Sequence, residues 1–113
     1  MTNPKAQRLA LRRQKLRQQL SGLGPVLRGS LIQRFTQCGR AGCKCMRGEK
    51  HGPAHYLTVS YAKGRTRQVY VPKDLLPLAE RWVRNYRQAL TVLEGISSIN
   101  LELIRLREAL PNP

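Results

Sequence analysis

The stretch Cys38-Gly-Arg-Ala-Gly-Cys43-Lys-Cys45 holds all three cysteines of this 113-residue chain. Both histidines, His51 and His55, follow shortly after it. Thiolates and imidazoles at such short spacing are ligands that zinc favours, and the glycines between them permit tight turns. The pattern Cys-x4-Cys-x-Cys-x5-His therefore predicts a zinc knuckle held by Cys38, Cys43, Cys45 and His51.

The fourth ligand and the state of the thiols leave alternatives open. His51 is preferred because it lies in a turn bounded by Gly and Pro, whereas His55 begins a predicted strand. Without a metal, the three cysteines would be reduced thiols or a redox switch, since neighbouring cations favour thiol oxidation. A catalytic zinc usually has a carboxylate nearby, and nothing assigns that role to Glu49. We expect a structural metal and no enzymatic activity, and hence no small-molecule substrate.

The charge of the chain is strongly positive and unevenly distributed. The formal net charge is +15 and the pI is about 11.1. The first acidic residue is Glu49, and the chain before it carries eleven cations: Lys5, Arg8, Arg12, Arg13, Lys15, Arg17, Arg28, Arg34, Arg40, Lys44 and Arg47. A surface that only needed to be soluble would mix both signs. The imbalance predicts a polyanionic partner, nucleic acid before an acidic membrane surface.

The sequence shows no signal for a membrane or for secretion. No apolar run approaches the length of a transmembrane helix, and the N-terminus lacks the apolar core of a signal peptide. The odd number of cysteines argues against a disulfide framework. The sequence thus predicts a cytoplasmic protein with no membrane association.

Three strands are predicted on the two sides of the cysteine stretch. Residues 26–37, 55–62 and 65–71 alternate apolar and polar side chains. Pairing Val59 with Val69 and Leu57 with Val71 collects the apolar side chains on one face. This register requires the three-residue loop Lys63-Gly64-Arg65, although glycine usually ends such loops.

Two helices are predicted at the ends of the chain. Residues 4–20 are rich in good helix formers and carry a thin apolar stripe that Arg13 interrupts, which is typical of a basic arm or of a helix packed lightly on the body. Asp74 can cap a long helix toward Ala109. Its second half carries a heptad-like apolar seam, with residues at 89, 92, 96, 99, 103, 106 and 110. The seam favours a homodimer through residues 89–110. In the alternative, a bend near Gly95 folds the helix back to form an intramolecular hairpin with the first helix.

These elements predict an α+β fold: a small three-stranded antiparallel sheet with a zinc knuckle between its first two strands, backed by a long C-terminal helix and preceded by a basic N-terminal helix. The predicted division is a basic helical arm (1–21), the sheet with its knuckle (26–73) and the long helix (74–110). Leu57, Val59, Val69 and Val71 are expected to face the aromatic side chains of Trp82 and Tyr86 on that helix.

The opposite face of the sheet is the predicted binding surface. It combines hydroxyls, an amide, an arginine and two tyrosines, which can form hydrogen bonds and stack on bases. Polar residues on the solvent side of a one-sided sheet are also expected without any ligand. The predicted nucleic-acid contacts are Arg34, Tyr56, Thr58, Ser60, Gln68 and Tyr70 on the sheet, Arg65 and Arg67 in its hairpin, Arg8, Arg12, Arg13 and Arg17 in the arm, and Arg40, Lys44 and Arg47 in the knuckle.

The sequence resembles two groups of known proteins. The strings Arg28-Gly-Ser-Leu31, Cys38-Gly, Cys43-Lys-Cys45, His51-Gly-Pro53, Tyr56-Leu57 and Tyr70-Val-Pro-Lys73 resemble a family of short, basic, uncharacterised bacterial and archaeal proteins. That resemblance runs from Arg28 to the last helix, leaves out the arm before Ser21, and supports His51 as ligand. The order of strands and turns is also similar to the three-stranded N-terminal DNA-binding domain of tyrosine recombinases, which implies a sheet face that reads DNA. The knuckle departs from that pattern.

The sequence therefore predicts a zinc-stabilised, dimeric DNA-binding protein, with a link to mobile elements or regulation. An RNA- or ribosome-associated protein is the second hypothesis. A protein-interaction adaptor acting through the C-terminal helix is the third.

Overall fold

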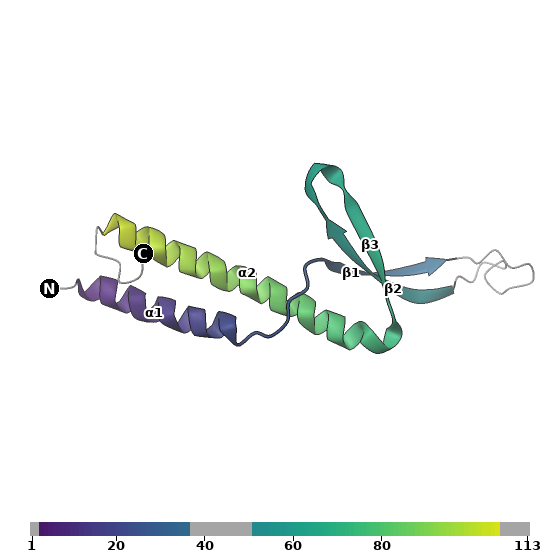
Figure 1. Cartoon of the computed structure of the whole chain (residues 1–113), viewed down its shortest axis with the longest axis horizontal. Coiled ribbons are helices and arrows are strands. Elements are labelled where there is room, and N and C mark those ends of the chain that lie inside the picture. The colour runs from purple at the N-terminus through teal and green to yellow at the C-terminus, as the bar shows by residue number, and fades with distance from the viewer. Residues whose placement is uncertain (1–2, 37–50, 107–113) are drawn as a thin grey trace, which may run out of the picture. The chain divides into compact units, whose positions relative to one another are not determined.

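The computed structural model describes residues 3–36 and 51–106. It contains helix α1 (Pro4–Ser21), strands β1 (Ser30–Thr36), β2 (His51–Ser60) and β3 (Thr66–Val71), and helix α2 (Leu76–Arg105), in that order (Figure 1). The predicted α+β class is confirmed. The chain groups into a helical unit, residues 1–26 with 85–113, and a sheet unit, residues 27–84, so that α2 contributes to both. This grouping joins the predicted arm to the second half of the long helix.

Helix α1 begins where its sequence provides a cap. The side chain of Asn3 accepts a hydrogen bond from the backbone N–H of Lys5 at 2.8 Å, and Pro4 occupies the first turn, where a missing N–H costs nothing. The helix ends at Ser21, and the following Gly22 N–H bonds to carbonyls of the last turn. The helix thus occupies almost the range that its composition predicts.

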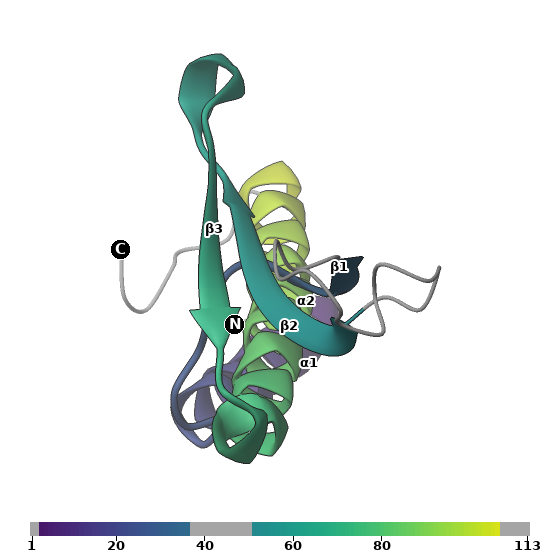
Figure 2. The same cartoon turned by 90° about the vertical axis from the view of Figure 1, so that its right-hand side faces the viewer.

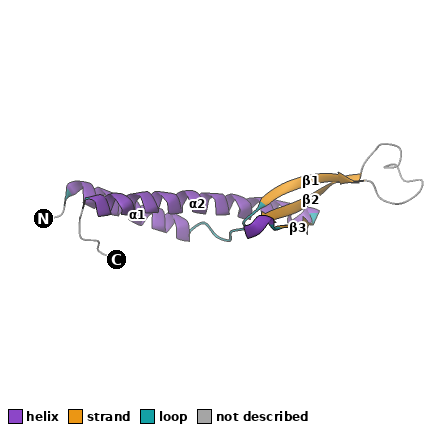
Figure 3. Cartoon of the chain, turned by 90° about the horizontal axis from the view of Figure 1, so that it is seen from above, coloured by secondary structure: helices purple, strands orange, loops and turns teal. Residues whose placement is uncertain are grey.

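In the helical unit, α1 packs along the second half of α2 (Figure 3). Ala6, Ile99 and Leu103 are buried together, with Leu9, Leu16 and Leu106 packed against them. Polar contacts join the same two helices, including an ion pair between Lys5 Nζ and Glu102 Oε1 at 3.3 Å. The seam residues Ile99, Leu103 and Leu106 of α2 are therefore covered by α1 of the same chain, as the intramolecular alternative predicted.

Helix α2 continues without interruption through Gly95, so the bend that the intramolecular alternative placed there is wrong. A Cβ at this position would lie 3.1 Å from Leu16 Cδ1, which is tighter than an ordinary contact. Gly95 therefore serves close packing between the helices. The expected helix start was also wrong, because a 3-10 turn, Lys73–Leu75, precedes α2 and Asp74 lies inside that turn.

The sheet has the order β1-β2-β3, and both pairs are antiparallel. Figure 2 shows β1 and β3 on opposite sides of β2. Strand β2 begins at His51, four residues before the predicted start, because Thr36 pairs with His51 beyond a bulge in the ladder. Pro53 lies in this irregular part, where a residue without an N–H is tolerated.

The hairpin between β2 and β3 corrects the predicted register. Leu57 pairs with Val69, and Val59 pairs with Arg67, so the partner of each residue lies two positions earlier in β3 than expected. The loop still has three residues, but they are Ala62, Lys63 and Gly64, with Lys63 at φ 62° and Gly64 at φ 70°. Gly64 thereby ends the loop in the left-handed region, as three-residue hairpins usually require.

One face of the sheet packs on the start of α2. Leu57, Val59 and Val71 are buried together with Ala79 and Val83, and Leu27, Leu31 and Leu76 pack at the edge of this core. The helix residues in the core are thus Ala79 and Val83, while Trp82 is half-buried and its carbonyl accepts a bond from the Leu27 N–H at 3.0 Å. Val69 shares the parity of this face but remains exposed.

Gly29 fixes where β1 starts. Its φ is +143°, and a Cβ there would lie 2.8 Å from Leu57 Cδ1 and 2.9 Å from the Thr58 carbonyl oxygen. Only glycine fits such a conformation and such a close approach. Residues 26–29, which were predicted as strand, therefore form the entry to the sheet, and β1 begins at Ser30.

Candidate nucleic-acid interface

The face of the sheet opposite its core, here called the outer face, gathers the side chains that alternation assigned to it. The register places Tyr56 and Tyr70 opposite each other, and likewise Thr58 with Gln68 and Ser60 with Thr66. Across β1, Ser30 pairs with Thr58 and Ile32 with Tyr56. The predicted face is confirmed because a register shift of two residues leaves side-chain parity unchanged. The predicted nucleic-acid contacts did not include Ser30 and Ile32, which also lie on this face.

The outer face has an aromatic half. The ring centroids of Tyr56 and Tyr70 lie 5.8 Å apart with an interplanar angle of 68°, an edge-to-face arrangement. The guanidinium carbon of Arg34 lies 5.6 Å from the centre of the Tyr56 ring. Tyr70 stands on the edge strand β3 and is 57% exposed. Arginine and tyrosine rings in this arrangement can stack on a base.

The outer face also has a polar half, made by Ser30, Thr58, Ser60, Thr66 and Gln68. Its members except Thr58 are exposed. The Thr58 Oγ1 atom is buried and has no hydrogen-bond partner within the described part of the chain. A ligand on this face would therefore reach Ser60 and Gln68 before Thr58.

The cations at the hairpin lie off the outer face. Arg67 pairs with Val59, and the Arg65 carbonyl accepts a bond from the Tyr61 N–H, so both arginines share the parity of the buried face. Both are exposed. Arg28 has a different role, since its Nη1 donates to the Ser60 carbonyl at 2.8 Å. Its guanidinium also lies 5.0 Å from the Tyr61 ring centre, and so holds the entry of β1 to the end of β2.

Most of the arginines of helix α1 that are predicted to contact nucleic acid are exposed to solvent. Arg8, Arg12 and Arg17 are exposed. Arg13 is half-buried, and its Nη1 donates to Asn100 Oδ1 at 2.7 Å. This contact explains why an arginine can interrupt the apolar stripe of α1. Three of the four predicted arm contacts are therefore accessible to a phosphate backbone, and the fourth already joins the two helices.

Most of the predicted zinc site lies outside the described residues. This applies to Cys38, Cys43 and Cys45, and equally to Arg40, Lys44 and Arg47. The backbone of His51 opens β2 and pairs with Thr36, which corrects the expectation that His51 lies in a turn. His55 is half-buried, with Nε2 3.3 Å from Gln33 Nε2. Among the described residues no three His, Cys, Asp or Glu side chains group as a metal site.

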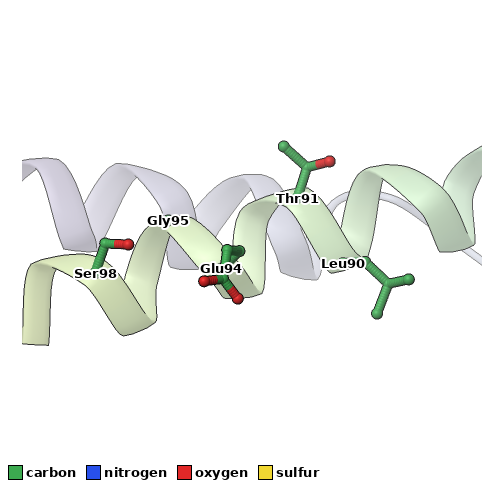
Figure 4. Close-up of a pocket in the computed structure, with 5 residues that line it drawn as sticks. All are labelled: Leu90, Thr91, Glu94, Gly95 and Ser98. Atoms are coloured by element: carbon green, nitrogen blue, oxygen red, sulfur yellow. The ribbon is translucent and has the colours of Figure 1, made fainter.

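A shallow hollow on α2 is the other surface feature of interest. It is lined by Leu90, Thr91, Glu94, Gly95 and Ser98, all from one helix (Figure 4). The Thr91 hydroxyl donates to the Arg87 carbonyl within the same helix at 3.2 Å. A single carboxylate beside two hydroxyls does not form a catalytic constellation.

No helix in the described part of the chain has the length and apolar character needed to span a bilayer. Comparison with known proteins finds no matching curated protein and no matching solved structure. A family model described as Domain of unknown function (DUF6788) matches residues 6–81. The chain therefore belongs to this uncharacterised family. The matched region includes most of α1, so the helical arm is part of the family's domain.

Proposed function

We propose that this DUF6788 protein binds nucleic acid, with duplex DNA as its principal ligand. In this proposal the outer face of the sheet contacts the bases and α1 contacts the phosphate backbone. The segment between β1 and β2 is stabilised by a structural zinc ion. The proposal concerns binding alone and assigns no catalytic step.

The observation that carries the proposal is the sign of the charges around the sheet. None of residues 30–36, 51–60 and 66–71 is acidic, whereas these strands carry Arg34 and Arg67. A sheet that only faced water would be expected to mix both signs. An exposed face of hydroxyls, an amide, an arginine and two tyrosines without a carboxylate is instead compatible with close approach of phosphates.

The chemistry of the polar half and of Arg34 suits base edges in a major groove. Sheets and ribbons of strands are known to enter this groove. Gln68 offers an amide of the kind that bonds adenine, and an arginine such as Arg34 can form paired hydrogen bonds with guanine. Ser60 adds a small hydroxyl that can bond either a base or a phosphate.

RNA is the second candidate ligand, and the two tyrosines favour it. Proteins that bind single-stranded RNA commonly stack its bases on aromatic side chains of a sheet. Tyr56 and Tyr70 would supply such a surface. Their number is low and the polar half of the face is larger, so duplex DNA remains the leading candidate.

A protein-interaction role through α2 is the third candidate. The helix exposes Leu90, Leu93, Leu101 and Ile104 on the side away from its buried seam. A homodimer through residues 89–110 would have to use such exposed side chains, since α1 covers Ile99 and Leu103 and Val92 is buried. A chain with a net charge of +15 also repels its own copies, which disfavours such a dimer at low salt.

The zinc proposal rests on the cysteine spacing and on the strand pairing. Thr36 and His51 pair across β1 and β2, so the two ends of the segment 37–50 are held together by the sheet. A segment closed in this way, carrying three cysteines, suits a metal that fixes its conformation. Its basic residues would then be held in place for phosphate contacts.

A binding assay tests the function. Fluorescence anisotropy of the full-length protein should be measured with a labelled DNA duplex and with an RNA hairpin of similar length, over a range of salt concentrations. The proposal predicts that the protein binds the duplex more tightly and that the affinity falls steeply with salt. Tighter binding of the RNA would favour the second candidate, and binding of neither would refute nucleic-acid binding.

A further inference from the structure

The two halves of the outer face differ in chemistry, and this difference suggests two kinds of contact. The row of Ser30, Thr58 and Gln68 and the pair Ser60–Thr66 are polar, whereas the row of Ile32, Tyr56 and Tyr70 is apolar and aromatic. Paired bases present hydrogen-bonding edges to a groove, while their rings are covered by stacking within the duplex. A tyrosine row therefore has little to bind on an intact duplex.

We infer that the aromatic half of the outer face is a stacking site for an unpaired base. The DNA that this face fits best is then a duplex that adjoins single-stranded nucleotides, such as an end with an overhang or a gap. This inference rests on the proposed function, because it assumes that the outer face binds DNA. It goes beyond the proposed function by specifying the class of DNA that the outer face binds.

The geometry of the tyrosine pair supports this assignment. The two rings meet edge to face at 68° with their centroids 5.8 Å apart, so neither ring lies flat on the other. Tyr70 is 57% exposed although it lies beside another aromatic ring. It is also on the edge strand, where a base can reach its ring from the side of the sheet. Stacking on such a ring would bury apolar surface that folding leaves in water.

Arg34 supplies the charge that such a site needs. Its guanidinium lies over the Tyr56 ring, 5.6 Å from the centroid. A planar guanidinium held against an aromatic ring can stack on a base or pair with the adjoining phosphate.

A purely structural role for Tyr70 makes a different prediction. If its ring served to cover the sheet, it would be largely buried, as Leu57 and Val71 are on the opposite face. Removing a ring that is more than half exposed should change stability little and should change binding only if a ligand stacks on it. This difference makes Tyr70 the position to test.

The experiment uses the full-length protein and three labelled probes: a blunt DNA duplex, the same duplex with a single-stranded overhang, and a single-stranded RNA with the sequence of the overhang. Wild-type protein should bind the overhang probe roughly 5- to 150-fold more tightly than the blunt duplex, which is the gain expected from one base stacked on one aromatic ring. Tyr70→Leu should abolish this preference, so that this variant binds the two DNA probes with similar affinity. Tyr70→Phe should keep the preference, as should Tyr61→Leu, which removes an exposed ring outside the outer face. A 2-aminopurine in the overhang should be quenched by wild type and not by Tyr70→Leu.

Equal affinity of wild-type protein for the two DNA probes would overturn the inference while leaving duplex binding intact. Retention of the preference by Tyr70→Leu would also overturn it, because the stacking site would then lie elsewhere. Tighter binding of single-stranded RNA than of the overhang probe would overturn the choice of DNA. Binding of no probe would refute the proposed function itself, and this result differs from the other outcomes.

Discussion

Exchange of the three exposed arginines of α1 for glutamine should flatten the salt dependence of DNA binding. Arg8, Arg12 and Arg17 are exposed on the helix, whereas Arg13 is half-buried and bonded to Asn100. If α1 contacts the phosphate backbone, the exposed arginines displace counterions from DNA and Arg13 does not. One helix thus contains both the test positions and a matched control.

The magnitude follows from the number of phosphate contacts. Each contact contributes about 0.9 to the slope of log K against log salt concentration on duplex DNA. The triple variant should therefore reduce the slope by roughly 2.7. At about 0.15 M salt, each lost contact corresponds to about 1 kcal/mol, so that affinity should fall by about 150-fold in total. Because phosphates carry no sequence information, this loss should be similar for every duplex.

The assay is fluorescence anisotropy with one duplex over a series of salt concentrations, for wild type, the triple variant and Arg13→Gln. The control should keep the wild-type slope and lose about 0.5–1.5 kcal/mol of unfolding free energy, the usual net value of a hydrogen bond. A triple variant with the wild-type slope would refute the assignment of α1 to phosphate contacts. A reduced slope in Arg13→Gln would show that the hydrogen bond to Asn100 does not keep this residue from contacting the DNA.

Three further results are expected. Leu103→Ala should lower the free energy of unfolding in urea by about 2–5 kcal/mol, because the side chain of Leu103 is 2% exposed. Leu101→Ala should lower it by less than about 0.5 kcal/mol, because the side chain of Leu101 is 62% exposed. Similar losses for the two variants would contradict the packing of the helical unit. Gly29→Ala should lower the free energy of unfolding by about 2 kcal/mol or more in the same assay, because the added Cβ would meet Leu57. An unchanged urea midpoint would contradict the close approach of Gly29 to Leu57 at the start of β1. Elemental analysis should find about one zinc per chain, lost in Cys43→Ser; metal-free wild-type protein would contradict the zinc knuckle.

The sheet illustrates how far the sequence determines a register. Alternation of apolar and polar side chains assigned each residue to its face, and that assignment is confirmed. The pairing partners were wrong by two residues, because such a shift keeps every side chain on its face and alternation cannot detect it. The position of Gly64 contained the missing information. Its preference for the last place in a three-residue loop selects Ala62–Gly64 and hence the observed pairs.

The helices show a second limit of prediction from sequence. The apolar seam of α2 indicates that something must cover it, and a heptad pattern is the same for a partner helix in the same chain or in another. The deciding residues lie in α1, where Ala6 is small enough to be buried against Ile99 and Leu103. Arg13 concealed this role, because a charged residue within a stripe is usually solvated, whereas here Asn100 binds it.

The strand boundaries depended on long-range contacts. Strand β2 begins at His51 because Thr36 is available opposite it, beyond a bulge that the local sequence does not reveal. The start of β1 depends on the close approach of Gly29 to Leu57, residues that are distant in the chain. For the candidate site, residue type and parity were sufficient to find the outer face. Its division into an aromatic and a polar half required the observed register.

The central claim, that the outer face of the sheet binds DNA, is tested most directly by a variant that changes this face alone. Replacing Arg34, Ser60 and Gln68 with alanine removes the guanidinium and two of the exposed polar side chains of this face. Arg81→Ala on α2 provides a control for the loss of one charge. Anisotropy with a DNA duplex should show at least a tenfold weaker affinity for the outer-face variant, an affinity close to wild type for the control, and unchanged thermal unfolding for both. An outer-face variant that binds the duplex as tightly as wild type would contradict the claim.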